Sequence, residues 1–340
     1  MQLVEQDALL ALHLAFPFAP AKAHQLFMQR ELLDKAIAPI LEESLLEKTR
    51  KAAAELGIDI VDYLDPTYPE GLKKLPDPPL VLYRKGLPTK GPTAAIVGTR
   101  ACSIYGQSIA KHMASTCAEQ GIAVVSGLAR GIDTAAHVGA LETGTTVAVI
   151  GSGLAHIYPK ENTHLARQIS EKGALYSEYP IWTPPDRFQF PRRNRLIAAM
   201  SDGSLLIEAP IKSGAMGTLE WAAKLGKLCF ALPGRADAET FRGNHFLIKE
   251  GKAKLVENGA EMVSLLRPDL LQRTEKKDLK ANLSAAEHQL LLQFPNSEIS
   301  FDELAALSRL PIPALNALLV GLSIKKIIRE YPGKLFKKVV

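Results

Sequence analysis

The segment from Asp186 to Arg195 is the part of the sequence best suited to bind a ligand. It reads Asp-Arg-Phe-Gln-Phe-Pro-Arg-Arg-Asn-Arg, so four arginines stand against one acid and give a net charge of +3 in ten residues. Arginine presents a planar fork to phosphate oxygens, and an exposed phenylalanine offers its face to an unpaired base. The candidate binding residues in this segment are Arg187, Phe190, Arg192, Arg193, Asn194 and Arg195.

Single-stranded nucleic acid is the ligand that this mixture of arginine and phenylalanine favours. Duplex DNA hides the faces of its bases, so interleaved aromatic residues indicate unpaired strands. The alternative is a solvated basic loop whose phenylalanines belong to the core. Asn194 and Arg195 run directly into the apolar residues 196–199, so bracing the fold is the alternative role for that end of the segment.

Small residues follow most of the predicted strands and begin one of the predicted helices. Such turns leave backbone N–H groups free for an anion, and ligands of open α/β sheets bind at the carboxyl edge. Three such elements on one edge could follow consecutive phosphates of a strand. The candidates at these turns are Arg100, Ser126, Gly127, Lys212, Ser213 and Gly214. Glycines that only turn the chain are the alternative.

Sequence patterns for common cofactors and catalytic groups are absent. His156 stands where a dinucleotide fingerprint beginning at Gly151 needs its third glycine, and no GxxxxGK[ST] phosphate loop occurs. The eight histidines form no HExxH pair or ligand cluster, and no GxSxG surrounds a serine. Asp133 precedes His137 by one helical turn, which fits capping or pairing better than acid–base chemistry. We therefore predict no catalytic residue, no metal and no cofactor.

Short apolar runs alternate with helical segments from residue 93 onward. The runs are apolar at every position, which is typical of strands buried on both faces of a mainly parallel sheet. Strand candidates are residues 94–97, 122–125, 146–150, 205–207 and 228–232, and helix candidates include 107–119, 134–141, 162–171 and 218–225. The alternation over residues 93–266 predicts an α/β core with a doubly wound, Rossmann-like sheet.

Smaller regions flank this core. Residues 1–62 have apolar side chains at helical spacing and predict a helical domain of SAM or helix-hairpin-helix type. A proline-rich connector follows at 63–92, with an edge strand expected at 80–83. After a charged linker at 267–282, residues 283–340 hold three helical patterns and a hairpin, which predict a winged-helix domain.

Composition fits a folded protein of two or three domains. The 340 residues are 47% hydrophobic and 23% charged, with three widely spaced cysteines, which argues against a disordered or disulfide-stapled chain. No apolar run is long enough to cross a bilayer, and the first residues hold acids where a signal peptide has basic residues. We expect a cytoplasmic protein with no membrane partner.

The net charge of +5 is concentrated in two places. Residues 325–338 carry six basic side chains against Glu330, a local charge of +5, and the segment 186–195 adds +3. The rest of the chain therefore carries −3 and is slightly acidic. One basic island lies on the predicted binding edge, and the other lies on the predicted wing.

Several motifs occur in an order that resembles the DNA-processing protein A family (DprA/Smf). They are Ala-Ile-Val-Gly-Thr-Arg at 95–100, then residues 103–106, 125–133, 136–137, 158–162, 177–180, 190–195, 212–214 and 233–234. The resemblance implies a non-enzymatic protein of natural transformation that binds and protects single-stranded DNA. It also implies a homodimer formed through the core, and help in loading the RecA recombinase. The family's positive DNA pocket corresponds here to Arg100, Arg187, Phe190, Arg192, Arg193 and Arg195.

Two other functions remain open on the sequence alone. Residues 217–220, Gly-Thr-Leu-Glu, resemble the phosphate loop of phosphoribohydrolases that act on nucleoside monophosphates, although Trp221 replaces their second glutamate. The winged helix could instead read duplex DNA. Its recognition-helix candidate at 313–324 is mostly apolar, however, and leaves few side chains for base edges. In the light of the resemblance, we expect a contact or regulatory module there.

Overall fold

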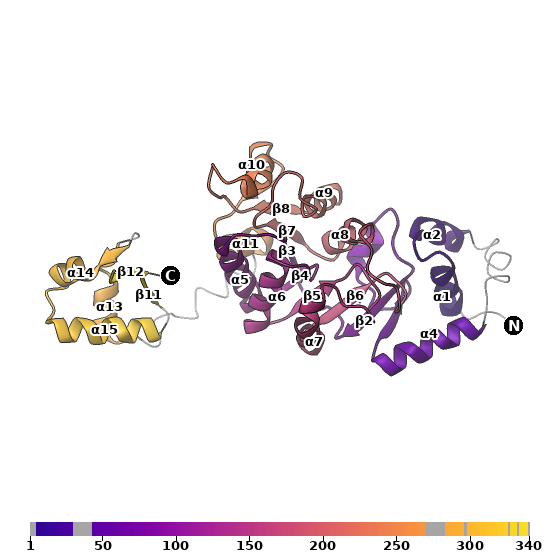
Figure 1. Ribbon diagram of the computed structural model, residues 1–340, viewed down its shortest axis with the longest axis horizontal. Helices are drawn as coiled ribbons and strands as arrows, with labels where there is room; N and C mark the ends of the chain where they lie inside the picture. Colours follow the sequence, from indigo (N-terminus) through magenta and orange to yellow (C-terminus); the bar gives the residue numbers. More distant parts are fainter. Residues whose placement is uncertain are drawn as a thin grey trace. The chain divides into compact units, whose positions relative to one another are not determined.

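The computed structural model describes residues 5–29, 43–268, 283–295, 298–325, 327–331 and 333–338. The chain divides into two units, Met1–Leu271 and Gln272–Val340 (Figure 1). Most of the predicted linker at 267–282 lies outside the described residues. Within those ranges, no single helix has the length and apolar character needed to span a membrane. One pair of helices, Phe301–Ser308 and Ile312–Ile324, meets these criteria only when counted together across a bend of 114°.

One sheet organises the first unit. Among the described residues it has nine strands in the order β1-β2-β6-β5-β4-β3-β7-β8-β9. Their bounds are β1 Asp59–Asp62, β2 Val81–Gly86, β3 Thr93–Val97, β4 Ala123–Ser126, β5 Thr146–Val149, β6 Ala174–Ser177, β7 Gly203–Leu206, β8 Leu228–Ala231 and β9 Lys254–Leu255. From β6 to β9 all neighbours run parallel, whereas β2 is antiparallel to β6 and β1. The prediction of a doubly wound, mainly parallel sheet is confirmed.

The proline-rich segment contributes a strand to this sheet. The edge strand expected at 80–83 exists as β2. However, β1 pairs with the outer side of β2, so β2 is an inner strand of the sheet. Strands β1, β6 and β9 are not anticipated by the apolar runs. β6 ends in Tyr176 and Ser177, and β9 is a two-residue strand with both residues exposed, so neither has the uniform apolar pattern of the central strands.

Helices cover both faces of the sheet (Figure 1). One layer comprises α5 (Ile104–Glu119), α6 (Ile132–Thr143), α7 (Thr163–Lys172) and α11 (Gly259–Leu266), and the other comprises α8 (Gln189–Ala199), α9 (Met216–Lys224) and α10 (Arg242–Lys249). Ala94 and Ile96 of β3 pack with the first layer, and Ala95 and Val97 pack with the second. Because successive strand side chains point to opposite faces, the apolar runs serve both layers.

The direction of winding reverses beside β3. From β3 the sheet grows through β4, β5 and β6 on one side, and through β7, β8 and β9 on the other. In doubly wound sheets, the carboxyl ends of the two strands at such a reversal border the crevice where ligands bind. The carboxyl ends of β3 and β7 therefore define the place to look for a site.

The N-terminal helices α1 (Glu5–Ala15), α2 (Pro20–Met28) and α4 (Glu43–Leu56) pack on the same sheet. Leu9 and Leu12 of α1 are buried in one apolar cluster with Tyr83 of β2 and Leu175 of β6. The described parts of residues 1–62 therefore share a core with the sheet and belong to the same unit. Periodicity shows that a helix has an apolar face, but it does not show which element covers that face.

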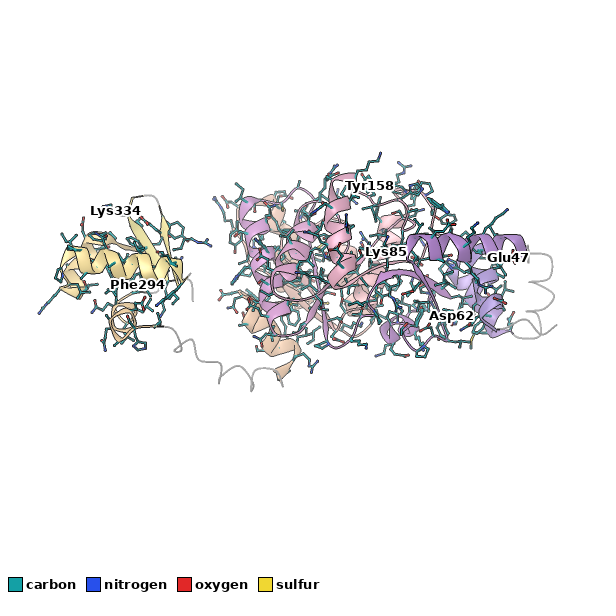
Figure 2. All side chains as sticks on the ribbon, turned by 90° about the horizontal axis from the view of Figure 1, so that it is seen from below. Glu47, Asp62, Lys85, Tyr158, Phe294 and Lys334 are labelled. Atoms are coloured by element: carbon teal, nitrogen blue, oxygen red, sulfur yellow. The ribbon has the colours of Figure 1, made fainter. Side chains whose placement is uncertain are left out.

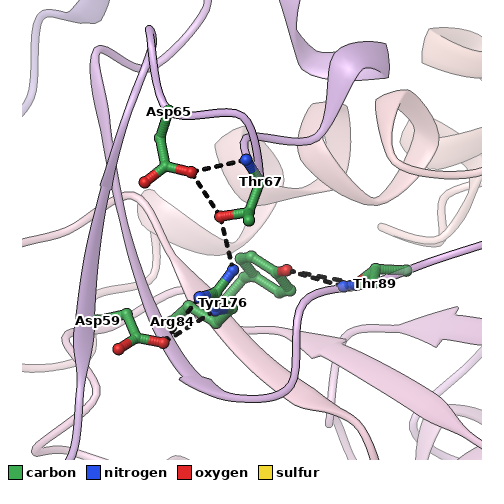
Figure 3. Close-up of polar contacts among 6 residues, drawn as sticks. All are labelled: Asp59, Asp65, Thr67, Arg84, Thr89 and Tyr176. Carbon is green, nitrogen blue, oxygen red and sulfur yellow. Dashed lines mark hydrogen bonds and ion pairs between the residues drawn. The ribbon is translucent and has the colours of Figure 1, made fainter.

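A polar cluster fastens the proline-rich segment to the sheet (Figure 3). The guanidinium of buried Arg84 donates to Asp59 Oδ2 at 2.8 Å and to Thr67 Oγ1 at 2.9 Å. Asp65 accepts hydrogen bonds from the backbone N–H and the hydroxyl of Thr67, at 2.6 and 2.7 Å. The buried charge is thereby paired, and the loop after β1 is held against β2.

The second unit has the arrangement predicted for a winged helix. Its described elements are α13 (Ala285–Leu291), α14 (Phe301–Ser308), α15 (Ile312–Ile324), β10 (Ile299–Ser300), β11 (Ile328–Tyr331) and β12 (Leu335–Lys338), with sheet order β10-β12-β11. Leu304 and Leu315 are fully buried between these elements. Val320 and Ile324 of α15 are exposed, so the outer side of this helix is apolar, as its sequence indicates.

Candidate nucleic-acid interface

A cleft of about 610 Å³ opens at the carboxyl ends of β3 and β7. Three segments supply most of its walls: residues 97–100 after β3, residues 185–197 around the start of α8, and residues 210–218 leading into α9. A smaller pocket shares Arg100, Phe190 and Arg193 with the cleft and adds Gly127 and Arg130. The cleft therefore lies where the direction of winding reverses, as the topology requires of a ligand site.

Arg100, Phe190 and Tyr158 form a stack on one side of the cleft. The Arg100 guanidinium lies over the Phe190 ring, 5.2 Å from its centroid, and the Tyr158 ring is 5.5 Å from the Phe190 ring. Figure 2 shows Tyr158 on the outside of the first unit, where it is 39% exposed. Phe190 is half-buried, so its main effect is to orient the exposed Arg100 by a cation–π contact.

Arg187, which lines the cleft, forms a second, more exposed pair with Phe188, which lies beside the cleft without lining it. Their guanidinium and ring are 4.7 Å apart, and Phe188 is 67% exposed. Asp186 fixes the turn, because its carboxylate accepts a hydrogen bond from the Phe188 backbone N–H at 2.8 Å. Phe188 is therefore the more exposed ring of the segment 186–195, and Phe190, the ring that the sequence prediction selects, is half-buried and lines the cleft.

The segment from 186 to 195 is not one continuous loop. Helix α8 begins at Gln189, so the arginines beyond it are placed on a helix that turns by about 100° per residue. Arg192, Arg193 and Arg195 therefore point in different directions, and each has a different set of partners. The expectation that all of them line one pocket is corrected by this geometry.

Arg193 faces the cleft but is anchored inward. It is 4% exposed, and its Nη1 donates to the backbone oxygens of Gly127, at 2.6 Å, and Val149. Burial lowers its pKa to about 10, an effect that nearby Asp133 opposes. A Cβ at Gly127 would lie 2.4 Å from Arg193 Nη1, so a larger residue there would displace the Arg193 guanidinium. Arg193 and Gly127 together shape the floor of the cleft.

Asn194 joins α8 to the loop that precedes α9. Its Nδ2 donates to the Gly214 backbone oxygen at 2.9 Å, which holds the third wall of the cleft against the second. Of the binding positions predicted on this loop, Ser213 and Gly214 line the cleft. Lys212 is exposed but does not line it. The amide of Asn194 is thus a positioning group between two cleft walls.

Arg195 does not reach the cleft. It is 2% exposed, forms an ion pair with buried Glu178, and lies 3.4 Å from Asp77 Oδ2. Burial raises the pKa of the Glu178 carboxyl, an effect that the Arg195 guanidinium opposes. Arg195 therefore braces the fold, which is the alternative role, and does not contact DNA as predicted. Its charge is paired with Glu178 and Asp77 inside the protein.

Two more predicted positions are also turned away from the cleft. Arg192 is half-buried, and its Nη1 donates to the backbone oxygen of Phe18 at 2.5 Å, between α1 and α2. Ser126 is fully buried, and its hydroxyl donates to the Ile96 backbone oxygen at 2.7 Å. Neither side chain is among the residues that line the cleft. Burial corrects Ser126 as a direct contact, whereas half-buried Arg192 stays a predicted one.

The Asp133–His137 spacing does not produce an acid–base unit. Asp133 accepts a hydrogen bond from the Gly127 backbone N–H at 3.1 Å, whereas His137 Nδ1 is 2.7 Å from Thr146 Oγ1. Burial lowers the pKa of His137 to about 3, so the ring is neutral. Across the described ranges, no three His, Cys, Asp or Glu side chains gather in a way that could hold a metal ion.

Residues 217–220, which resemble the phosphate loop of a phosphoribohydrolase, lie in the first turns of α9, so their side chains point in different directions. Thr218 is buried and lines the cleft, but Glu220 is exposed and is not a lining residue. Residues two apart on a helix do not face each other, so this carboxylate is directed away from the threonine. The acid that such an enzyme requires is therefore not among the residues that line the cleft.

Sequence reasoning misses three exposed or partly exposed residues of this region. Tyr158 and Arg130 line the smaller pocket, and Phe188 stands beside Arg187. For Phe188 the signal is present, because it alternates with the arginines as Phe190 does. For Tyr158 and Arg130 no spacing rule applies, since they come from loops that only the fold brings to α8.

Family models match both units of the chain. The model for DNA recombination-mediator protein A matches residues 59–267, and the model for the DprA winged helix domain matches residues 274–334. The DNA processing protein DprA of Bacillus subtilis is 36% identical over 222 residues, which cover 64% of this chain and 72% of that protein. DprA of Streptococcus pneumoniae is 42% identical over 205 residues, covering 59% and 72%.

Solved structures of two DNA processing proteins have the same architecture. The X-ray structure of DprA from Streptococcus pneumoniae aligns with a TM-score of 0.62 at 33% identity, covering 77% of this chain and 93% of that chain. DNA processing protein A from Helicobacter pylori aligns with a TM-score of 0.57 at 30% identity, covering 62% and 96%. The latter structure is described as giving insight into a unique single-stranded DNA binding mode.

Proposed function

Because the chain belongs to the DNA recombination-mediator protein A family, we propose that its first unit binds single-stranded DNA in the cleft. The observation that supports this most directly is the pair of exposed guanidinium groups, Arg100 and Arg187, which line the cleft and each lie over an aromatic ring. The single-stranded DNA binding described for the similar Helicobacter pylori protein supports the same ligand.

Binding by these groups does not depend on base sequence. Arg100 and Arg187 offer forks to phosphate oxygens, and the rings of Phe188 and Tyr158 offer faces that accept any base. Asn194 and Arg193 hold the walls in position through the Gly214 and Gly127 backbone oxygens. Because the attraction to phosphates is electrostatic, affinity falls steeply as salt rises.

The proposal extends to the biological role that the family resemblance implies. In natural transformation, the protein would act in the cytoplasm, protect incoming strands, form a homodimer through the Rossmann-like core and help to load a RecA-type recombinase. Light scattering measures the dimer. RecA-dependent ATP hydrolysis on strands coated with a single-strand-binding protein measures loading. A monomer, or RecA activity unchanged by this protein, would contradict the corresponding part.

The binding proposal is tested with fluorescently labelled oligo-dT and anisotropy over a salt series. We expect Arg100→Ala to weaken binding and to reduce the slope of log affinity against log salt by about 0.7 for each phosphate that the variant no longer neutralises. Arg167→Ala is the matched control, because Arg167 is an exposed arginine on α7 that pairs with Glu171. Equal affinity for a duplex of the same length, or no effect of Arg100→Ala, would refute the proposal.

We propose no catalytic step for this cleft. The competing enzyme activity is tested by incubating the protein with nucleoside monophosphates and separating the products. A free base that appears with the wild-type protein and disappears with Glu220→Gln would overturn the non-enzymatic assignment.

A further inference from the structure

A second hollow lies beside the cleft, between the N-terminal helices and the loop that follows β6. It has a volume of about 570 Å³, and we call it the Trp182 groove. Its lining is mostly apolar and includes Leu14, Phe18, Leu45, Lys48, Ile181 and Trp182. Trp182 is 61% exposed, Phe18 is 52% exposed and Leu45 is 42% exposed. Large apolar side chains gathered in one exposed hollow mark a binding surface.

Backbone hydrogen bonds fix the residues on either side of Trp182 and leave most of its side chain exposed. The Ala155 N–H donates to the Ile181 oxygen at 3.0 Å, and the Gly153 N–H donates to the Thr183 oxygen at 2.9 Å. The indole is 6.3 Å from the His156 ring in an edge-on arrangement, so the two rings are not stacked face to face. A hydrogen-bonded loop that presents a largely exposed tryptophan is well suited to stack with a flat ligand.

The groove continues the edge that carries the cleft. Pro180 to Pro184 line the groove, and the next residues of the same segment, Pro185 and Arg187, line the cleft. The segment follows the carboxyl end of β6, in the same parallel array as β3. Arg192 links the two hollows, because it extends from α8 to the backbone oxygen of Phe18 in the groove. A strand that leaves the cleft along this segment therefore meets the groove next.

We propose that the Trp182 groove is a second subsite for the same DNA strand, in which unpaired bases stack on Trp182. This inference rests on the proposed function of the cleft. Charge favours a nucleic-acid occupant over an apolar protein segment, because Lys48 stands in the groove and Arg187 lines the cleft that the groove continues. The ligand class is single-stranded nucleic acid with bases of any type, since stacking is tolerant of sequence.

The chain offers a direct spectroscopic test. It has two tryptophans, and the other, Trp221, is half-buried on α9 beside Lys224. Trp221→Phe leaves Trp182 as the remaining tryptophan. We expect long oligo-dT to quench its fluorescence. An abasic strand with the same number of phosphates should bind without quenching, because it has no base to stack.

Affinity provides an independent readout of the same interaction. We expect Trp182→Ala to weaken binding of long oligo-dT about fivefold or more, within the range measured for single base-stacking residues. The loss should be small for an oligo-dT short enough to fill the cleft alone. Trp182→Phe should restore most of the affinity, since it keeps an aromatic face. Leu87→Ala, at another exposed apolar residue, is the control and should change nothing.

The outcomes separate this inference from the proposed function. If oligo-dT binds and depends on Arg100, while Trp182 fluorescence and the affinity of Trp182→Ala are unchanged, the groove is not a DNA subsite and the cleft proposal stands. If Trp182→Ala changes the oligomeric state in light scattering and leaves DNA affinity intact, the groove is an interface between copies, and the inference is overturned. If oligo-dT does not bind, both proposals fail.

Discussion

The two basic segments of the chain, residues 186–195 and 325–338, look alike in sequence and differ in structure. In the first, Arg193 and Arg195 are almost fully buried and bind carbonyl or carboxylate oxygens. In the second, Arg329 is exposed and stands directly opposite Lys337 across the β11–β12 pair. A helix distributes neighbouring residues around its axis, whereas a strand pair aligns them on one face.

The difference shows that charge counted along a sequence is not the charge presented to a ligand. Arg193 shapes the floor of the cleft, Arg195 pairs with Glu178 inside the fold, and Arg187 is left as the most exposed cation of that segment. In the wing segment, Arg329, Lys334 and Lys338 are exposed, whereas Lys325 is paired with Glu287 and Lys334 lies over the Phe301 ring. We therefore expect substitutions in the first segment to split into effects on stability and effects on DNA binding.

The largest expected effect is on stability. Replacing Arg195 by Met leaves Glu178 buried without its partner, and breaking a buried ion pair costs about 3–5 kcal/mol of unfolding free energy. Both tryptophans lie in the first unit, so urea unfolding followed by tryptophan fluorescence reports on that unit. If the Arg195→Met variant unfolds at the same urea midpoint as the wild type, this arginine is not structural.

The next effect is a dependence of stability on pH. His137 has its pKa lowered from 6.5 to about 3 by burial, and His13 has its pKa lowered to about 4. The unfolded histidine binds a proton at a pH where the folded one stays neutral. The unfolding free energy of the first unit should therefore fall as pH drops from 6.5 toward 3, on the order of 2–4 kcal/mol for His137.

Urea unfolding at several pH values, again by tryptophan fluorescence, measures this slope. His137→Gln should flatten it, whereas His112→Gln should not, because His112 is exposed on α5. If His137→Gln shows the same dependence of unfolding free energy on pH as the wild type, groups other than His137 cause the acid sensitivity.

Arg187→Ala gives the complementary result. Arg187 is exposed, so we expect stability within about 0.5 kcal/mol of wild type. Affinity for oligo-dT should fall about threefold to tenfold at low salt, because the variant removes one cation that neutralises phosphate. The same two assays, urea unfolding and anisotropy, then separate Arg187 from Arg195. Parallel losses in both assays would remove the distinction between exposed and buried arginines.

The smallest effect is expected on the wing. Lys337→Gln combined with Lys338→Gln removes two cations from β12, and we expect oligo-dT affinity of the full chain to change by less than about twofold at moderate salt. Anisotropy measures this directly. A loss as large as that of Arg187→Ala would place the wing in the DNA-binding surface and reverse the comparison.

The sequence predicts the central strands and helices because their patterns are local. The runs at 94–97, 146–150 and 228–232 correspond to β3, β5 and β8 within one residue at each end. The apolar pattern does not predict β6, because Tyr176 and Ser177 interrupt it. The sequence does not predict helix α8 either, because its first turns are rich in charge and contain Pro191, so they resemble a loop.

For the site, the sequence selects the correct segments but not the roles within them. Arg100, Arg187, Ser213 and Gly214 are predicted positions that line the cleft. Arg195 and Ser126 are predicted positions that the fold buries elsewhere, because their partners are Glu178 and the Ile96 oxygen. Residue type predicts which chemistry is available, and burial decides whether a ligand can use it.

By itself, the sequence determines the family, the alternation of strands and helices, and the location of a basic, aromatic segment at the carboxyl edge of the sheet. These features follow from spacing along the chain. The tertiary structure decides which arginines remain free, since Arg195 meets Asp77 and Glu178 from distant segments. It also decides that the N-terminal helices lie beside Trp182. Both outcomes depend on contacts between residues far apart in sequence, which no local pattern records.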